Sequence, residues 1–375
     1  MSFVISIAEA RKLHLLSTGL TANTFAKGKA GTLQAIEHLG YVQIDTISVV
    51  ERAHHHVLYS RLPFYKPQHL YDLVEKDKTV FEYWSHAAAY LPMRDYRFSL
   101  LRKNLYNKGH WSHYKNKKVL KYVLERITAE GPLQSRHFEE DKKPTGWWNW
   151  KETKRALEQL FMQGTLMVAG RSGFQKVYDL TERVLPAHVN TTPPSADEFA
   201  QYLILSAIRA NGFANEEEIS YLRRGIKPSV VKNVEHLVKE GLIVPLHIKG
   251  VSKPYYTTDD ALQLLNSKAA KKQVHILSPF DNSLIQRKRI NTLFGFDYTI
   301  ECYVPEPKRQ YGYFCLPILY ADKFVGRIDC KADRPKQQLL IKSLHFEEGF
   351  KRSSSFDNAF NTALKKFATF NGCKI

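Results

Sequence analysis

The sequence predicts an α+β protein in which tandem winged-helix (helix-turn-helix) modules are followed by a C-terminal β-barrel-like domain. Two observations predict this class. A helix–glycine–hairpin pattern occurs twice in the middle of the chain, and the sequence changes from helical to β-rich near His275. At 375 residues the chain is also long enough for several compact units. We predict four segments, with bounds at 1–115, 116–190, 191–270 and 271–375.

The first segment reads as helix, helix, short strand and helix. Ser6-Ile7-Ala8-Glu9 is a capping box that opens a helix to about Ser17, and a second helix near Thr32–Leu39 ends at Gly40. The alternation over Tyr41–Asp45 predicts a short strand. Ser48 and Glu51 have the spacing of another capping box, which predicts the start of a third helix. This order predicts a winged-helix-like N-terminal unit.

Two stretches in the middle of the chain are similar to each other. Residues 157–168, "LEQLFMQGTLMV", align with residues 234–245, "VEHLVKEGLIVP". In each copy an amphipathic helix ends at a glycine, and a β-hairpin then turns at a second glycine. Helices expected over Val119–Glu130 and Ala196–Ala210 precede the two copies, and "NTTPPS" at 190–195 reads as a junction. A helix followed by a hairpin is the pattern of the recognition helix and wing of a winged helix.

The C-terminal segment is rich in β-formers. Runs such as "YTIECYVPE" and "QQLLIKSLHFEE" are separated by Pro, Gly and Asp, and Asp322 indicates a tight hairpin. We expect a small antiparallel barrel or a curved sheet here, closed by a helix over about Phe356–Phe370.

Composition narrows the class of partner. The chain has 55 Lys and Arg against 37 Asp and Glu, a formal charge of +18, which favours a polyanion: nucleic acid first, an anionic membrane surface second. We find no apolar run of the roughly 20 residues needed to span a bilayer and no secretory leader at the N-terminus. The four cysteines lie far apart without a Cys-x-x-Cys pair. This spacing excludes a zinc knuckle and a disulfide scaffold and fits the cytoplasm.

One polar pair interrupts an apolar stretch, "LGYVQIDTIS". In a strand, Gln43 and Asp45 share one face, about 6.5–7 Å apart, whereas on a helix they would point in nearly opposite directions. The strand interpretation makes them a candidate catalytic pair. Two structural alternatives stay open at this point. Asp45 could cap the next helix, although Ser48 and Glu51 already serve that purpose, and Gln43 could be a solvated residue on an edge strand.

Several segments resemble the AlkZ/YcaQ family of winged-helix DNA glycosylases, and the YcaQ (AlkX) branch in particular. The resemblance covers nearly the whole chain and rests on "GYVQIDTISVVERAHHHVLYSRLP", "EYWSHAAAYLPMRDYRF", "SPFDNSLIQRKRINTLFGFDYTIECYVPEPKRQYGYFCLPIL" and "VGRIDCKADR". It implies tandem winged helices, a C-terminal β-barrel-like domain and a Gln-hydrophobic-Gln or Gln-hydrophobic-Asp catalytic motif. That motif becomes Gln43-Ile44-Asp45, the Asp form, which the family associates with broader unhooking of crosslinked purines.

The motif suits that reaction. A guanine alkylated at N7 is already cationic, so it leaves with little help from an acid, and positive charge develops at C1′ of the sugar. A carboxylate about 4 Å away, at an effective dielectric near 20, offsets this charge by roughly 4 kcal/mol, or about three decades of rate. We assign this role and the activation of water to Asp45, and positioning to Gln43. No lysine is singled out as an amine nucleophile, which favours a monofunctional hydrolase without a cofactor.

Basic residues in the repeats and in the third family segment are candidates for DNA contacts. Lys154 and Arg155 begin the helix of the first repeat, and Arg171 and Lys176 lie in its hairpin. The run Arg287-Lys288-Arg289 belongs to the family segment. Such side chains would contact phosphates and make binding depend on salt, although ordinary solvated helix faces also carry lysines.

His54-His55-His56 raises the question of a metal site. Three consecutive residues on a helix spread over 200°, so the three rings cannot bind one ion from one face, and we predict no metal. We expect His54 and His55 to lie near the DNA or to be packed locally.

The sequence therefore predicts a DNA glycosylase of base excision repair that hydrolyses N7-alkylated purines and unhooks interstrand crosslinks. Its partner would be double-stranded DNA with alkylated or crosslinked purines, its site a shallow open cleft because a crosslinked base cannot be flipped, and its state a monomer. The alternative is a non-enzymatic winged-helix regulator or architectural protein, which gives Gln43 and Asp45 no task. A nuclease would need clustered carboxylates for Mg²⁺, and we find no such cluster.

Overall fold

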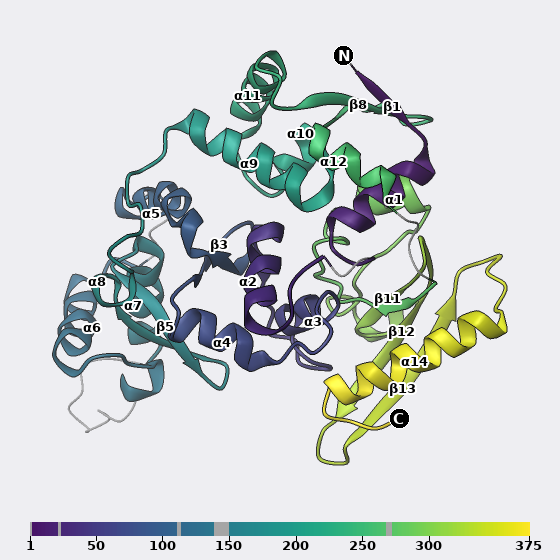
Figure 1. The fold of residues 1–375 in the computed structure, drawn as a ribbon. Helices are drawn as coiled ribbons and strands as arrows, with labels where there is room; N and C mark the ends of the chain where they lie inside the picture. Colours follow the sequence, from purple (N-terminus) through teal and green to yellow (C-terminus); the bar gives the residue numbers. More distant parts are fainter. Residues whose placement is uncertain (1, 22–23, 111–113, 139–149, 268–271) are drawn as a thin grey trace. The chain divides into compact units, whose positions relative to one another are not determined.

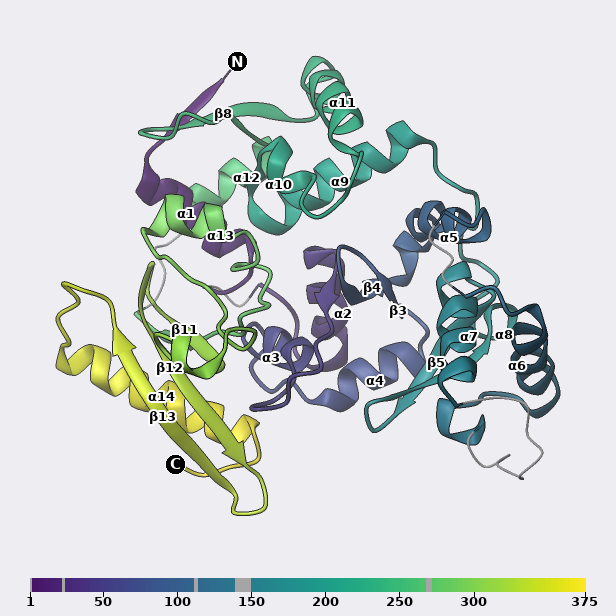
Figure 2. The ribbon, with the colours of Figure 1, turned by 180° about the vertical axis from the view of Figure 1, so that it is seen from behind.

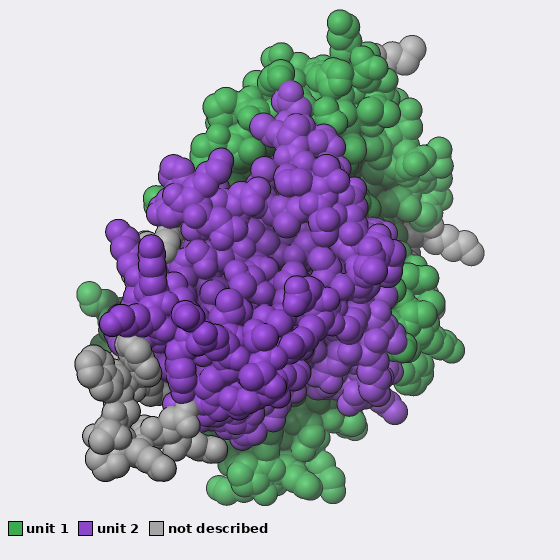
Figure 3. Space-filling model, turned by 90° about the vertical axis from the view of Figure 1, so that its left-hand side faces the viewer, with its two compact units in different colours: residues 1–65, 200–375 green, residues 66–199 purple. Residues whose placement is uncertain are grey.

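The protein consists of two compact units. A computed structural model describes residues 2–21, 24–110, 114–138, 150–267 and 272–375. The first unit comprises residues 1–65 and 200–375, so it is built from both ends of the chain, and the second comprises residues 66–199. Figures 1 and 2 show the elements, and Figure 3 colours the two units. The unit boundary at 199/200 lies near our expected junction at 190/191, and the one at 65/66 lies inside our first segment. The four-segment division stays a prediction.

The first unit begins with alternating short strands and helices. Its N-terminal elements are β1 (Phe3–Ile5), α1 (Ile7–Ser17), α2 (Gly28–Leu39), β2 (Val42–Gln43) and α3 (Ala53–Tyr59). Its C-terminal elements follow α9 (Ala196–Asn211), which crosses the unit boundary: β7 (Phe213–Ala214), α10 (Glu216–Ile219), α11 (Lys227–Lys239), β8 (Val244–Ile248), β9 (Tyr255–Thr257), α12 (Asp259–Gln263), η3 (Leu264–Asn266), β10 (Val274–Ile276), α13 (Arg287–Phe294), η4 (Glu306–Lys308), β11 (Cys315–Tyr320), β12 (Lys323–Asp333), β13 (Gln338–Phe346) and α14 (Ser354–Phe370).

The second unit combines helices with two antiparallel hairpins. Its elements are α4 (Pro67–Glu75), β3 (Val80–Trp84), β4 (Ala88–Pro92), η1 (Met93–Ser99), α5 (Leu100–Asn107), α6 (Lys117–Glu130), η2 (Ser135–Phe138), α7 (Trp150–Gln163), β5 (Leu166–Ser172), β6 (Gln175–Leu180) and α8 (Thr181–Val184). Strand β3 pairs with β4, and β5 pairs with β6. None of the helices in the described part of either unit is long and apolar enough to cross a membrane.

The ends of the first two helices are as predicted. The Ser6 hydroxyl accepts from the Glu9 amide at 3.2 Å while the Glu9 carboxylate accepts from the Ser6 amide at 2.7 Å, which completes the capping box of α1. Gly40 ends α2 with φ of 76°, in the left-handed region where glycine is favoured.

The prediction for the start of the third helix was wrong. Helix α3 begins at Ala53, its N-cap is Arg52, and no side chain caps it. Glu51 instead accepts from the neighbouring Arg52 amide at 2.9 Å, and its own amide donates to the Asn371 Oδ1 at 2.6 Å. The segment before α3 thus satisfies its polar groups through residues more than 300 positions away, which no local cap signal can reveal. Strand β2 is also shorter than expected, because it ends at Gln43.

The repeated pattern forms the predicted elements. Helix α7 is followed by Gly164 and the β5–β6 hairpin with its turn at Gly173, and α11 is followed by Gly241 and the β8–β9 hairpin with its turn at Gly250. All four glycines have positive φ, which explains why glycine recurs at these positions. The second hairpin is extended by β1 and β7 into a sheet of order β1-β8-β9-β7, with β1 parallel to β8.

The C-terminal strands form an open sheet, not a barrel. Their order is β10-β11-β12-β13, and each neighbouring pair is antiparallel. Strands β10 and β13 are the two edges among the described strands. The tight turn predicted at Asp322 joins β11 to β12, and the predicted closing helix is α14. The α+β class is therefore confirmed, and the expected barrel is replaced by an antiparallel sheet with one face covered by α14 and the other packed in part against α13.

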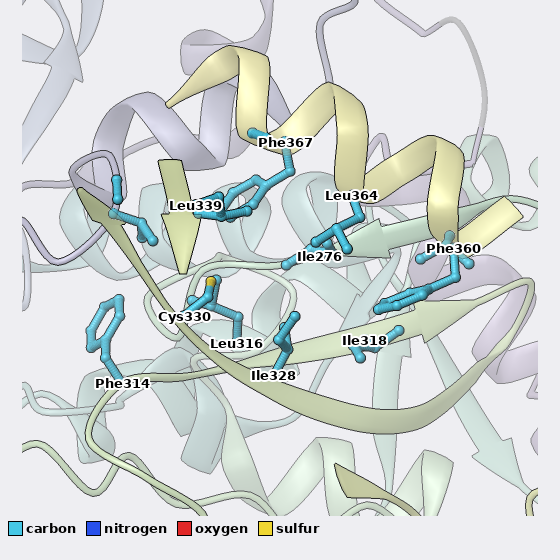
Figure 4. Packing of buried hydrophobic residues seen from close by; sticks show 14 of the residues in the cluster. Ile276, Phe314, Leu316, Ile318, Ile328, Cys330, Leu339, Phe360, Leu364 and Phe367 are labelled. Atoms are coloured by element: carbon cyan, nitrogen blue, oxygen red, sulfur yellow. The ribbon is translucent and has the colours of Figure 1, made fainter. Parts of the chain in front are cut away.

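Helix α14 covers this sheet with a stripe of aromatic and aliphatic side chains. In Figure 4 its residues Phe360, Leu364 and Phe367 lie over the sheet residues Ile318 and Ile276. The spacing of three and four residues places the stripe on one side of the helix. Each fully buried side chain of this kind stabilises the fold by about 1.5–3 kcal/mol, so this core fixes α14 and its C-cap residue Asn371 firmly on the sheet.

A buried ion pair connects the two ends of the chain within the first unit. Arg61 and Asp281 form two hydrogen bonds of 2.8 Å, and both side chains are 0% exposed. Arg61 also donates to the carbonyl of Thr18, at the end of α1, at 2.6 Å. Burial alone would raise the pKa of Asp281, but the Arg61 guanidinium and the hydrogen bonds from Ser283 outweigh it and hold the pKa below its usual range. The pair therefore stays charged inside the protein.

We expect Asp281→Asn to lower the free energy of unfolding by about 3–5 kcal/mol, because it leaves the Arg61 charge buried without a counter-charge. Chemical denaturation at neutral pH measures the change. Asp260→Asn, at an exposed position of α12, is the matched control and should change stability by less than about 0.5 kcal/mol. Equal stability of the two variants would contradict the role of the pair.

Candidate functional site

The Gln43-Ile44-Asp45 segment sets two polar side chains between buried apolar ones. Val42 is 0% exposed and Ile44 is 9% exposed, so their burial fixes the backbone of the segment. Gln43 is also buried, at 9% exposed, and its Oε1 atom has no hydrogen-bond partner among the described residues. Leaving such an acceptor unpaired costs about 1–3 kcal/mol. The solvated alternative for Gln43 is therefore wrong, and the acceptor capacity of its buried oxygen is unused among the described residues.

Asp45 lies just after β2 in a half-buried position. Its Oδ2 accepts from the Ile47 amide at 2.7 Å, an Asx-type turn that holds the carboxylate in one orientation. Burial raises the pKa of Asp45, and the Ile47 and Thr46 amides and the nearby Arg52 charge oppose the increase only in part. Asp45 does not cap α3. The result is an oriented carboxylate that is more basic than an ordinary aspartate.

The segment that follows Asp45 is attached to the C-terminal sheet and helix. The Val49 carbonyl accepts from the Ala332 amide at 2.8 Å, and the Ser48 carbonyl accepts from Arg334 at 3.3 Å. The Glu51 amide donates to Asn371 at 2.6 Å. Val50 is buried in the same hydrophobic core as α14. The position of Asp45 is therefore set by residues near the other end of the chain.

Asn282 is a site residue that the sequence analysis missed. Its Nδ2 donates to the carbonyl of Tyr41 at 3.1 Å, two residues before Gln43, and its Oδ1 is buried without a hydrogen-bond partner in the described structure. It directly follows Asp281 of the buried ion pair. The available signal was its place in the family segment "SPFDNSLIQRKR", where polar residues follow an apolar strand.

A loop with an exposed aromatic residue also lies near Asp45. The Asp45 carboxylate interacts electrostatically with the neighbouring side chains of Cys302 and Tyr303. Burial and, less strongly, this nearby charge raise the pKa of the Cys302 thiol. The sequence analysis quoted this loop, "ECYVPEPK", within a family segment but did not single out either residue.

Of the four basic residues predicted in the first repeat, two are exposed. Lys154 and Arg155 lie on the exposed side of α7. Arg171 and Lys176 instead both pair with the buried carboxylate of Glu82, at 2.7 Å and 3.0 Å. A buried carboxylate requires a counter-charge, so these two hairpin residues neutralise the charge of Glu82 inside the second unit. We remove Arg171 and Lys176 from the set of proposed DNA contacts.

The run Arg287-Lys288-Arg289 is divided in the same way. Arg289 is 1% exposed, forms an ion pair with Glu218 and donates to the Phe213 carbonyl at 2.8 Å. Arg287 is half-buried, with its guanidinium 4.6 Å from the centre of the Tyr298 ring. Consecutive helical residues point in different directions, so only Lys288 of the three is exposed. The predicted phosphate contact is retained for Lys288 alone.

The two histidines predicted near DNA are buried instead. His54 is 2% exposed and His55 is 3% exposed, and the His55 Nδ1 lies 2.7 Å from the Tyr65 hydroxyl. Burial lowers the pKa of the third, His56, to about 4, and its Nε2 lies 2.8 Å from the Ile276 carbonyl. Local packing, the second of our two expectations, is therefore the correct one. Within the described residues, no group of three His, Cys, Asp or Glu side chains could hold a metal ion.

A basic α+β protein with two helix–hairpin repeats, and with an oriented carboxylate two residues from a buried, unpaired amide, has the features of an enzyme that acts on DNA. The family model described as DNA glycosylase AlkZ-like matches residues 36–370, and the chain belongs to this family. It is a DNA glycosylase, a DNA repair hydrolase, and its partner is DNA. The fold is similar to that of Streptomyces sahachiroi DNA glycosylase AlkZ, with a TM-score of 0.67, 15% identity and coverage of 99% of this chain and 98% of that chain.

We expect Asn371→Ala to slow base release about tenfold, because the Glu51 amide loses its acceptor and the segment that carries Asp45 loosens. Single-turnover assays on alkylated duplex measure the rate, and Asn371→Asp, which keeps an acceptor oxygen, should recover most of it. Asn358→Ala, on the exposed side of the same helix, is the control. A wild-type rate for Asn371→Ala would show that the attachment does not position the carboxylate.

Proposed function

We propose that this glycosylase hydrolyses the N-glycosidic bond of N7-alkylated purines and unhooks interstrand crosslinks formed through them. The observation that carries the proposal is the buried, unpaired Oε1 of Gln43 two residues before the oriented carboxylate of Asp45. A buried acceptor without a hydrogen bond lowers the stability of a fold. Such acceptors are found at functional sites, where the substrate or a water molecule supplies the missing donor.

Asp45 supplies electrostatic stabilisation. As the cationic purine departs, positive charge moves to C1′ and the ring oxygen of the sugar. The turn to the Ile47 amide holds the carboxylate before the reaction begins, so little reorganisation is needed in the transition state. In the proposed reaction the carboxylate faces the sugar or a water molecule.

The same carboxylate also activates water. Burial makes Asp45 more basic than an ordinary aspartate, which favours removal of a proton from the attacking water. Gln43 accepts a hydrogen bond from that water through its Oε1 and orients it toward C1′. The water oxygen bonds to C1′, its proton passes to Asp45, and the electron pair of the broken bond leaves with the purine.

Hydrolysis without a lyase step fits the lysines of the described chain. A lyase requires an unprotonated amine at the site. Burial lowers the pKa of Lys103 to about 7, but this side chain is 3% exposed in the second unit, with its Nζ 3.9 Å from the centre of the Tyr96 ring. Its burial keeps it from a sugar carbon, so we propose a monofunctional enzyme.

The two repeats supply DNA binding in this proposal, and we assign them as winged-helix modules. In each, a short extended segment that follows a long helix pairs with the outer strand of the hairpin: Leu133 bridges to Tyr178, and β7 pairs with β9. Lys154, Arg155 and Lys288 are the exposed members of the predicted set and would contact phosphates. One chain carries both residues of the catalytic pair, which is consistent with a monomer.

The half-buried position of Asp45 supports crosslink unhooking. Asp45 is half-buried and is followed by the exposed Thr46, so C1′ of a nucleotide that stays tethered to the opposite strand can approach it. A deep base pocket would exclude such a substrate.

Asp45→Asn is expected to lower the rate of base release about a thousandfold while leaving duplex affinity within about twofold, since the amide keeps the shape but loses the charge. The assay uses duplexes with N7-methylguanine and with a nitrogen-mustard crosslink. Base release by wild type but not by Asp45→Asn supports the proposal. Duplex binding without base release by wild type would favour the regulator hypothesis.

Activity should fall as the pH falls, because Asp45 must be ionised and protonation removes its charge. Burial raises its pKa, so the loss begins at a higher pH than for an exposed aspartate. Arg52 lowers this pKa, so Arg52→Gln should move the acidic limb of the rate profile to still higher pH. Arg224→Gln, at an exposed position, is the control. An unmoved limb in Arg52→Gln would exclude Asp45 as the group that titrates.

A further inference from the structure

Tyr303 is an unusually exposed aromatic residue. Its relative exposure is 74%, equalled among the large hydrophobic residues of the described chain only by Phe64. An aromatic ring exposed to water lacks the stabilisation that burial of its apolar faces would provide. A binding partner that covers one face of the Tyr303 ring would supply part of it. Exposure of one ring is ordinary on a protein surface, but this ring lies on a loop that is held by several hydrogen bonds.

The loop that carries Tyr303 is rigidly built. The carboxylate of Glu301 accepts from the amides of Gln310, Tyr311 and Gly312 at 2.8, 2.8 and 3.1 Å. Burial would raise the pKa of Glu301, but these amides outweigh it and hold the pKa low. Thus the loop is closed at its base by a charged acceptor with three donors.

Two further interactions hold the tip of this loop. The Val304 amide donates to the Glu301 carbonyl at 2.9 Å, and Arg309 donates to the Val304 carbonyl at 2.9 Å. The backbone that carries the exposed ring is therefore held in one conformation, which reduces the entropy lost on binding.

The loop and the Asp45 segment are neighbours. Cys302 and Tyr313 pack against the same hydrophobic core as Ile47 and Val49, which follow Asp45 in the chain. The Asp45 carboxylate also interacts electrostatically with both Cys302 and Tyr303. The loop that carries the exposed ring thus packs on the same core as the segment that carries the carboxylate proposed to face C1′.

We propose that Tyr303 is a base-stacking residue that covers one face of the alkylated purine while its glycosidic bond lies over Asp45. The inference rests on the proposed function, because the base is bonded directly to C1′. An N7-alkylated purine carries a positive charge, and the electron-rich face of a phenol ring attracts it more strongly than it attracts neutral guanine. Tyr303 would thereby contribute to the selection of damaged over undamaged purines.

A binding experiment tests this role without requiring catalysis. One duplex carries a single 2′-fluorinated N7-methyl-deoxyguanosine, in which the fluorine destabilises the charged sugar and slows cleavage. The matched duplex carries 2′-fluoro-deoxyguanosine. The ratio of the two Kd values is measured for wild type, Tyr303→Phe, Tyr303→Leu and Phe64→Leu, the last being the control because Phe64 is equally exposed.

Wild type and Tyr303→Phe should prefer the cationic base by a similar ratio, since both retain an aromatic face. Tyr303→Leu keeps an apolar side chain but loses that face, so its ratio should fall about tenfold. Phe64→Leu should match wild type. A preserved ratio in Tyr303→Leu, or no preference in wild type, overturns the inference.

Base release measured on the unfluorinated duplex separates this inference from the proposed function. If wild type releases no base but Tyr303→Leu still loses the preference, the proposed reaction fails and the stacking role stands. If wild type is active and Tyr303→Leu matches it in both rate and preference, the reaction stands and the stacking role fails.

Discussion

The buried pair between Arg61 and Asp281 is the constraint on which the first unit depends. Two charges inside a protein are stabilising only when their geometry satisfies every donor and acceptor. Arg61 meets this demand by binding Asp281 and the end of α1 together, and Ser283 adds further donors to Asp281. Asn282 is thereby placed against the carbonyl of Tyr41, two residues before Gln43. Two apolar side chains in place of Arg61 and Asp281 could stabilise the interior equally well. A charged pair also specifies one register between chain segments 220 residues apart.

The candidate site depends on this connection between the N-terminal and C-terminal parts of the first unit. Gln43 and Asp45 belong to the N-terminal part, whereas the groups that hold and surround them, Asn371 and Tyr303 among them, belong to the C-terminal part. The core beneath α14 supplies the rigidity. Preorganised carboxylates are effective in catalysis because the protein, and not the substrate, has already balanced the cost of orienting and partly burying them. In this glycosylase the packing of α14 on the C-terminal sheet provides the stability that offsets this free-energy cost.

The net charge of +18 is a poor guide to individual DNA contacts. Arg289, Arg171 and Lys176 neutralise buried or partly buried carboxylates, and Arg61 does the same in the interior of the first unit. A Lys or Arg side chain can neutralise a buried carboxylate or can be exposed for contact with phosphates. Only its burial and its ion-pair partners in the structure distinguish these two roles. The overall charge still indicates a polyanionic partner, because the acidic residues are too few to neutralise all 55 basic ones.

The sequence by itself determined the local elements, the repeat and the family. Caps, glycines with positive φ and apolar periodicity are local properties, so α1, the end of α2, both helix–hairpin repeats and α14 could be predicted. It also singled out Gln43 and Asp45, because an amide and a carboxylate stand out in an apolar segment. Only the tertiary structure decided that the C-terminal strands form an open sheet, that His54 and Arg289 are buried, and that the loop of Tyr303 packs on the same core as the segment after Asp45. These features depend on which distant side chains neutralise, cover or orient one another, and such pairings arise from packing between segments that no local pattern encodes.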